Sequence, residues 1–226
     1  GGNDGLSEYA RHYSVDGTAP FQSYMVSYLS DLRRVYARLD IPSTSMPAKG
    51  YPVILFAHGW VGQDKAQDYN FGYDVTSLAG ELINGYVDAG FLVITPGYLG
   101  HGTVDGAQAG GLDIMESWDN ATYLAPTFYA IDLLNLVEGL SFLNSTDWKK
   151  WAGNKTLSPK ANLNAINLTG HSQGGDVALT ALAVSGEGSS IKNTFAAASI
   201  WSGNIPSRFT QLETFAPMAT TLQAFV

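Results

Sequence analysis

The sequence INLTGHSQGGDVALTALA, Ile166–Ala183, is the stretch that decides the fold. An apolar run stops at Gly170, Ser172 follows two residues later, and Gly174 and Gly175 lead into a pattern with helical spacing. Small residues on both sides of a serine are what a sharp turn between a strand and a helix requires. Such a turn strains the serine backbone and holds its hydroxyl clear of the sheet. The stretch therefore predicts a strand, a tight turn that presents Ser172, and a helix.

Strand and helix patterns alternate along the rest of the chain. The continuous apolar run Val53–Ala57 is typical of a central parallel strand that is buried on both faces, and Phe91–Tyr98 is predicted to be the next such strand. Asp74–Gly90 and Ala121–Leu143 have apolar residues three and four positions apart, which predicts helices. Two further strands are expected, a half-buried one at Val35–Pro42 and another at Phe195–Gly203.

Strands that alternate with helices predict an α/β fold with a predominantly parallel central sheet flanked by helices. Ligands bind such sheets beyond the carboxyl ends of the strands. His58, Tyr98 and Ser172 each follow a predicted strand end, so we expect a functional site at that edge. We expect an N-terminal extension at 1–30, the core at 31–203, and the start of a lid, cap or incomplete C-terminal part at 204–226.

Composition excludes several classes of protein. The 226 residues are 45% hydrophobic and 14% charged, which is typical of a globular domain. The net charge of −8 argues against a nucleic-acid partner, and the absence of cysteine excludes disulfides and thiolate chemistry. No apolar run approaches the ~20 residues of a membrane span. The opening GGNDG resembles the segment after the lipidated cysteine of bacterial lipoproteins, so we expect an extracytoplasmic or secreted protein, with such a tether as one form.

No cofactor or metal is expected. Asp113, Glu116 and Asp119 are carboxylates that could ligate Ca²⁺, but their spacing does not match a calcium-binding loop of the EF-hand type. A solvated loop is the simpler prediction for this acidic segment.

Three segments together resemble the α/β-hydrolase superfamily. They are FAHGW (Phe56–Trp60), TPGYLGHG (Thr95–Gly102) and LTGHSQGGDVAL (Leu168–Leu179), and the resemblance extends from about Val35 to Gly203. The doubled glycine of GHSQGG is similar to that of secreted lipases and esterases, and also to the prolyl oligopeptidase-like group. The resemblance implies hydrolysis of a carboxylic ester, or less often of an amide, through an acyl-serine intermediate.

The resemblance also implies roles for particular residues. Ser172 lies in the G-x-S-x-G motif and would be the nucleophile. The backbone N–H groups of Trp60 and Gln173 would form the oxyanion hole. The His58 side chain is expected to bond the backbone of its loop, and His101 to belong to a structural turn. Side chains expected to line the substrate pocket are those of Trp60, Tyr98, His171 and Tyr123.

The rest of the catalytic triad is missing from the expected order, which is serine, then an acid, then histidine. Asp176, Glu187 and Glu213 follow Ser172, but none has a suitable position, and no histidine follows it at all. The triad acid and histidine are therefore expected outside this chain, in a C-terminal segment of roughly 80–150 residues or in a second chain. The alternatives are a serine peptidase of the prolyl oligopeptidase-like kind and a catalytically inactive binding domain.

Overall fold

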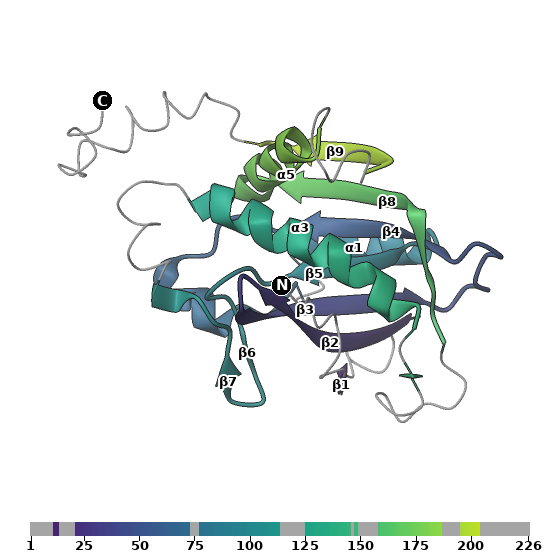
Figure 1. The fold of residues 1–226 in the computed structure, drawn as a ribbon, viewed down its shortest axis with the longest axis horizontal. Helices are drawn as coiled ribbons and strands as arrows, with labels where there is room; N and C mark the ends of the chain where they lie inside the picture. Colours follow the sequence, from purple (N-terminus) through teal and green to yellow (C-terminus); the bar gives the residue numbers. More distant parts are fainter. Residues whose placement is uncertain are drawn as a thin grey trace.

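A seven-stranded sheet forms the centre of the molecule (Figure 1). The computed structural model describes residues 11–13, 21–72, 77–113, 125–145, 147–148, 158–186 and 195–203. From one edge to the other the strands are β1 (Arg11–Tyr13), β2 (Phe21–Ser30), β3 (Arg33–Pro42), β5 (Leu92–Pro96), β4 (Tyr51–Ala57), β8 (Ala161–His171) and β9 (Ala197–Trp201). The pairs β5–β4, β4–β8 and β8–β9 are parallel, and the three pairs before them are antiparallel. The sheet is therefore mixed, with a parallel half that contains the Ser172 strand.

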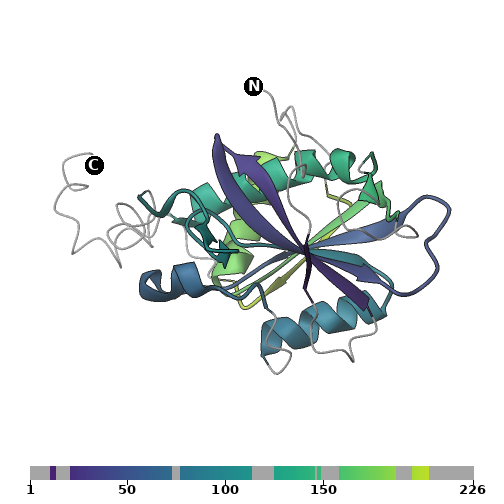
Figure 2. The same ribbon diagram turned by 90° about the horizontal axis from the view of Figure 1, so that it is seen from below.

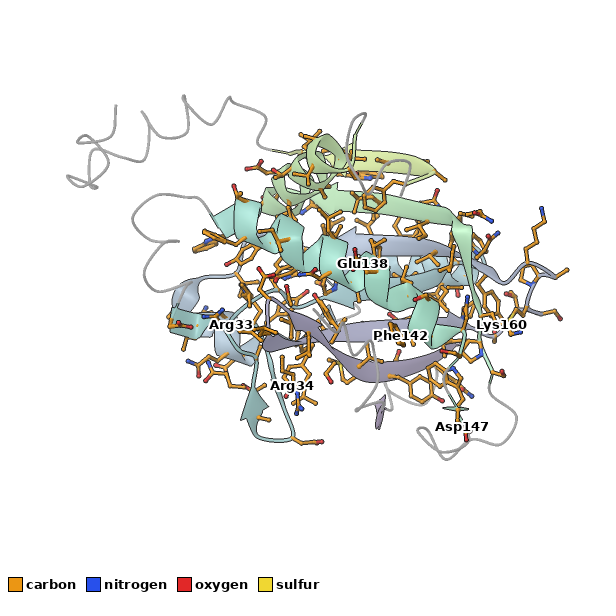
Figure 3. The ribbon with its side chains drawn as sticks, in the orientation of Figure 1. Arg33, Arg34, Glu138, Phe142, Asp147 and Lys160 are labelled. Carbon is orange, nitrogen blue, oxygen red and sulfur yellow. The ribbon has the colours of Figure 1, made fainter. Side chains whose placement is uncertain are left out.

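Helices cover both faces of the sheet (Figure 2). Helix α1 (Leu78–Asp88) lies on one face, whereas α3 (Ala125–Leu143) and α5 (Gln173–Val184) lie on the other. Side chains fill the layer between α3 and the sheet, while Glu138 and Phe142 lie on the exposed face of α3 (Figure 3). Two smaller elements, the 3₁₀ helix η1 (Gln63–Asp68) and the hairpin β6 (Thr103–Val104) with β7 (Ala107–Gln108), follow β4 and β5 along the chain.

Strand β4 is buried on both faces, as its continuous apolar run predicts. Ile54 and Phe56 pack with the core residues of α1, whereas Val53, Leu55 and Ala57 pack with those of α3 and α5. Successive side chains of a strand point to opposite faces, so only an unbroken apolar run can fill both cores. The fold class and the central position of this strand are confirmed.

Register brings the ends of the parallel strands together. Ala57 at the end of β4 pairs with Gly170 of β8, and Gly170 in turn pairs with Ile200 of β9. The segments that follow β4, β8 and β9 therefore leave the sheet at one edge. This edge carries His58 and Ser172, in agreement with the position expected for the site.

Strand β2 differs from the sequence prediction, because Phe21–Ser30 lies within the segment assigned to an N-terminal extension. It pairs along its full length with β3, and Tyr24, Val26 and Tyr28 are buried in the main core. The sheet therefore includes the ten residues of β2 and the three of β1, all of which precede the predicted core boundary at residue 31. Residues 204–226, expected to begin a lid or cap, lie outside the described part of the chain.

Strand β3 is more deeply buried than its half-buried prediction. Arg38 and Asp40 are fully buried, and the Arg38 Nε donates to Asp40 Oδ1 at 2.8 Å. The Ser23 hydroxyl also donates to Asp40, and Arg38 Nη1 donates to the Gly72 carbonyl at 2.8 Å. Charged side chains on the second face of β3 thus enter the protein interior, where they form an ion pair with each other.

The helices agree with their predicted segments over the residues described. Ser77 caps α1 by accepting a hydrogen bond from the Gly80 N–H at 3.1 Å, so the helix begins later than the predicted Asp74. No helix in the described ranges is long and apolar enough to cross a membrane.

Candidate active site

Ser172 lies on a strained turn between β8 and α5. Its backbone has φ 56° and ψ −125°, a conformation that side-chain-bearing residues rarely adopt. The Ser172 N–H donates to the Trp201 carbonyl at 3.0 Å, and the Ser172 carbonyl accepts from the Gly175 N–H at 2.9 Å. These two bonds fix the turn against β9 and the first turn of α5. The strand, turn and helix therefore have the arrangement that the sequence predicts.

Close backbone contacts explain the glycines of this turn. A Cβ atom on Gly174 would lie 2.0 Å from the Ala57 carbonyl oxygen, and one on Gly170 would lie 2.2 Å from the Gly174 carbonyl oxygen. Neither backbone oxygen can move away, because each belongs to the β4 end or to the start of α5. The first turn of α5 can therefore pack directly on the end of β4, beside the loop that contains His58 and Gly59.

The loop after β4 places a second backbone segment next to Ser172. A Cβ atom on Gly59 would lie 3.5 Å from Ser172 Cβ and 3.3 Å from the His171 carbonyl oxygen. In the described residues, neither the Trp60 N–H nor the Gln173 N–H donates a hydrogen bond. Gln173 is also the first residue of α5, where the helix dipole favours negative charge. Within the described part of the chain, two backbone donors without partners thus belong to the segments next to Ser172, and such donors can stabilise an oxyanion.

The His58 side chain fixes the orientation of this loop. Its Nδ1 lies 2.7 Å from the Gly59 carbonyl oxygen, so Nδ1 must carry the hydrogen of this bond. The Gly59–Trp60 peptide is planar and trans, so its N–H points away from the carbonyl that His58 binds. His58 thus acts on the backbone of its loop, as expected from sequence.

Aromatic rings enclose His58. Its ring stacks on those of Tyr69 and Tyr98, with centroids 4.2 Å away in each case, and Tyr98 stacks on Tyr129 at 4.6 Å. His101 meets the Tyr129 ring edge to face at 5.4 Å, and its Nδ1 lies 2.9 Å from the Leu99 carbonyl oxygen. Burial lowers the pKa of His58 to about 3 and that of His101 to about 4. Both imidazoles are therefore neutral at pH 7 and belong to the core beneath the site.

Tyr98 lies in this core instead of lining an accessible substrate pocket. It has no exposed surface, and its φ of 58° turns the chain immediately after β5. This differs from the sequence prediction, because a position just past a strand end does not determine whether the side chain points outward. Trp60, by contrast, is 64% exposed beside the serine, and His171 is partly exposed. Tyr123, the fourth residue predicted for the pocket, lies outside the described residues.

No triad partner is found beside Ser172 in the described residues. Its hydroxyl forms no hydrogen bond with a histidine or a carboxylate there, and Asp176 is buried within α5. Glu187 and Glu213 lie outside the described ranges, as do Glu116 and Asp119 of the acidic segment. The described part of the chain contains no group of three side chains that could hold a metal ion.

Asp132 is a buried acid that the sequence patterns did not single out. It occupies a core position of α3 and accepts hydrogen bonds from the Leu99 N–H at 2.8 Å and the Ser30 hydroxyl at 2.5 Å. The available signal was an aspartate at an apolar position of an otherwise apolar helix, where burial requires a polar partner.

The neutral state of His101 predicts a pH dependence of stability. In the unfolded chain this group has a pKa near 6.5, so the unfolded state binds more protons as the pH falls below that value. The difference between the folded and unfolded pKa values of His101 contributes up to about 3 kcal/mol to the free energy of unfolding. This contribution is complete above pH 6.5 and is lost as the pH falls to 4. The variant His101→Asn keeps a hydrogen-bond donor but does not titrate.

Urea unfolding of the wild-type protein and of this variant between pH 4 and 7.5 measures the effect. The wild type should be the more stable at pH 7.5, and its advantage should shrink toward pH 4. The opposite contribution of Asp132 cancels in the difference, and His58, whose pKa His101 also lowers, adds to the same trend. If the free energies of unfolding of the two proteins differ by the same amount at every pH, His101 is not a neutral, buried group.

Comparisons with known proteins agree with this architecture at the level of the fold. The chain is similar to an acetyl xylan esterase from Paenibacillus sp. R4, with 16% identity and a TM-score of 0.54 over 95% of this chain and 64% of that one. It is also similar to a puromycin hydrolase, with 15% identity and a TM-score of 0.56 over 94% of this chain and 28% of that one. A third similar structure is a putative hydrolase from Legionella pneumophila, with 15% identity and a TM-score of 0.53 over 87% of this chain and 52% of that one. The sequence matches no protein-family model and no curated protein.

These similarities show that the chain has the α/β-hydrolase fold, as the sequence resemblance predicts. The chain spans between 28% and 64% of the length of the three structures. The fold is shared by esterases, lipases and peptidases.

Proposed function

We propose that this chain carries the nucleophile and the oxyanion hole of a serine hydrolase that cleaves carboxylic esters. The observation that carries the proposal is the strained backbone of Ser172, next to which the N–H groups of Trp60 and Gln173 have no hydrogen-bond partner among the described residues. A binding domain would have no use for a strained serine at the start of a helix, whereas a nucleophile gains exposure from it.

The proposed reaction has two steps. The Ser172 hydroxyl attacks the ester carbonyl while a general base takes its proton, and the negative oxygen of the tetrahedral intermediate accepts from Trp60 and Gln173. The base then gives the proton to the departing alcohol, which leaves an acyl-serine. Water attacks the acyl group by the same route, releases the acid, and restores the hydroxyl.

We propose that the base and its acid partner lie outside these 226 residues. The buried positions of His58 and His101 in the aromatic cluster favour this view. His12 lies in β1, five strands from β8 across the sheet, which at the usual strand spacing is ~24 Å. His171 immediately precedes Ser172 and makes no hydrogen bond to it in the described residues. The missing pair would come from a C-terminal segment or from a second chain.

The substrate we propose is an uncharged ester with an acyl or aryl group of modest size. The exposed Trp60 side chain, which follows Gly59 in the loop next to Ser172, favours an apolar or aromatic group, and the net charge of −8 disfavours an anionic one. Acetyl xylan is an ester substrate of this kind, and it is the substrate that the name of the Paenibacillus enzyme gives.

A panel of p-nitrophenyl esters and peptide p-nitroanilides tests the substrate class in the complete protein. We expect acetate and butyrate esters to have kcat/KM values at least ~10²-fold above that of any peptide amide, because the alcohol is the better leaving group. The variant Trp60→Ala should lower kcat/KM more for butyrate than for acetate, with Phe142→Ala on the exposed face of α3 as a control for loss of another exposed aromatic ring. A higher kcat/KM for peptides than for every ester would identify a peptidase.

A further inference from the structure

We infer that Asp132 is a positioning residue, which holds the oxyanion loop in place through Tyr98 and His58. The inference rests on the proposed function, since it assigns the Trp60 N–H to the oxyanion hole. Asp132 is a side chain of α3. It does not touch Ser172, and the proposed reaction assigns it no role.

Asp132 acts first on the peptide between Tyr98 and Leu99. Its Oδ2 accepts from the Leu99 N–H at 2.8 Å, and this N–H belongs to the peptide plane that follows Tyr98. Tyr98 has a φ of 58°, a left-handed backbone conformation that is unfavourable for a residue with a side chain. A buried hydrogen bond to a carboxylate offsets that strain and fixes the direction in which the Tyr98 ring points.

The Tyr98 ring acts next on His58. The two rings stack with centroids 4.2 Å apart and an angle of 26° between their planes, and the Tyr98 hydroxyl lies 3.5 Å from the His58 carbonyl oxygen. Tyr69 closes the other face of the imidazole at the same distance. His58 can therefore rotate only if one of the two tyrosines moves, because His58 and Tyr98 are buried and the partly buried Tyr69 packs on the other face of the imidazole.

His58 finally orients the Gly59–Trp60 peptide through its bond to the Gly59 carbonyl. Rotation of this peptide by a few tens of degrees would remove the Trp60 N–H from the developing oxyanion, and one such donor is worth ~10²-fold or more in kcat. Asp132, Tyr98 and His58 thus form one packed series between α3 and the site, in which each side chain fixes the next backbone segment.

The surroundings of Asp132 hold its carboxylate in the orientation that accepts the Leu99 N–H. Its second oxygen accepts from the Ser30 hydroxyl, which in turn accepts from Asn135 Nδ2 at 2.9 Å. Burial raises the pKa of Asp132 to about 7, and the bonds from Ser30 and Leu99 oppose the rise. Tyr28, Tyr98 and Asp31 are the other titratable groups that act on it. An apolar residue at this core position would avoid the free-energy cost of burying a carboxyl group. The aspartate is therefore explained by the two hydrogen bonds that it accepts from Ser30 and Leu99.

Two variants of similar shape test the inference in the complete protein. Asp132→Asn keeps an acceptor for the Leu99 N–H, whereas Asp132→Leu removes it. With p-nitrophenyl acetate we expect Asp132→Leu to lower kcat at least ~10-fold with KM within about twofold, and Asp132→Asn to stay within about threefold of the wild type. Ser23→Ala, which removes the other buried hydroxyl–carboxylate bond, controls for a general loss of stability and should not change kcat. Asp132→Ala replaces the leucine variant if that one does not fold.

A second measurement separates this inference from the proposed function. The His58 Nδ1–H proton is buried and hydrogen-bonded, so it should exchange slowly with water in the wild type, in Asp132→Asn and in Ser23→Ala, and at least ~10-fold faster in Asp132→Leu. This nuclear magnetic resonance signal does not depend on catalysis, so it decides the positioning role even if no ester is hydrolysed. Wild-type kcat in Asp132→Leu, or unchanged exchange of the His58 proton in that variant, would overturn the inference.

Discussion

Ser172→Ala is expected to reduce ester hydrolysis by the complete protein by ~10³-fold or more and to leave the fold intact. The hydroxyl is the only group that the substitution removes, and it forms no hydrogen bond with a histidine or carboxylate among the described residues. The bonds that fix the turn involve the backbone N–H and carbonyl of Ser172, which alanine retains. Loss of activity should therefore appear as a lower kcat at an unchanged unfolding temperature.

A buried serine at the C-terminal cap of α5 provides the matched control. Ser185 donates its hydroxyl to the Ala181 carbonyl at 2.8 Å at the far end of the same helix. Ser185→Ala should keep activity within about twofold of the wild type, because it changes neither the turn nor the loop after β4. Hydrolysis by Ser172→Ala at the wild-type rate would remove this serine from the mechanism.

The second large effect is expected from the segment that we propose to supply the general base. A serine hydroxyl is a weak nucleophile without an adjacent general base, and none is found beside Ser172 in the described part of the chain. The 226-residue chain alone should therefore hydrolyse p-nitrophenyl acetate at least ~10³-fold more slowly than the complete protein. The two proteins should be compared by kcat at the same pH, with unfolding curves to show that the shorter one is folded.

Adding the remaining segment as a separate polypeptide distinguishes a missing base from a damaged site. Recovery of activity with wild-type chain, and none with Ser172→Ala, would show that the segment supplies chemistry that the chain lacks. Equal activity of the short and complete proteins would contradict the proposal. The base would then have to be sought among the histidines present, beginning with His171.

The central part of the fold was predictable because its signals are local. The run Val53–Ala57 is buried on both faces, and the glycines around Ser172 are needed within a few residues of where they occur. Backbone contacts of 2.0–2.2 Å for a hypothetical Cβ leave glycine as the one residue that fits, so the turn is specified by its own sequence.

The other elements depend on partners that are distant in the sequence. Strand β2 was not predicted because Ser23 and Ser30 interrupt its apolar pattern, and each is buried only because Asp40 or Asp132 accepts its hydrogen bond. Tyr98 was expected at the rim because it follows a strand, yet the stacking of its ring on His58 and Tyr129 places it in the core. Local periodicity contains no information about such pairs.

Covalent labelling of Ser172 by a fluorophosphonate tests the central claim most directly. The reagent reacts with a serine only where a base activates the hydroxyl and an oxyanion hole stabilises the adduct. Trypsin should release residues 161–192 as one peptide, since Lys160 and Lys192 bound it, and mass spectrometry can locate the adduct within it. In the complete protein we predict one phosphonyl group per chain, on Ser172, and none in Ser172→Ala. An unlabelled protein, or a label on any other serine, would contradict the assignment of this chain as the nucleophile-bearing part of a serine hydrolase.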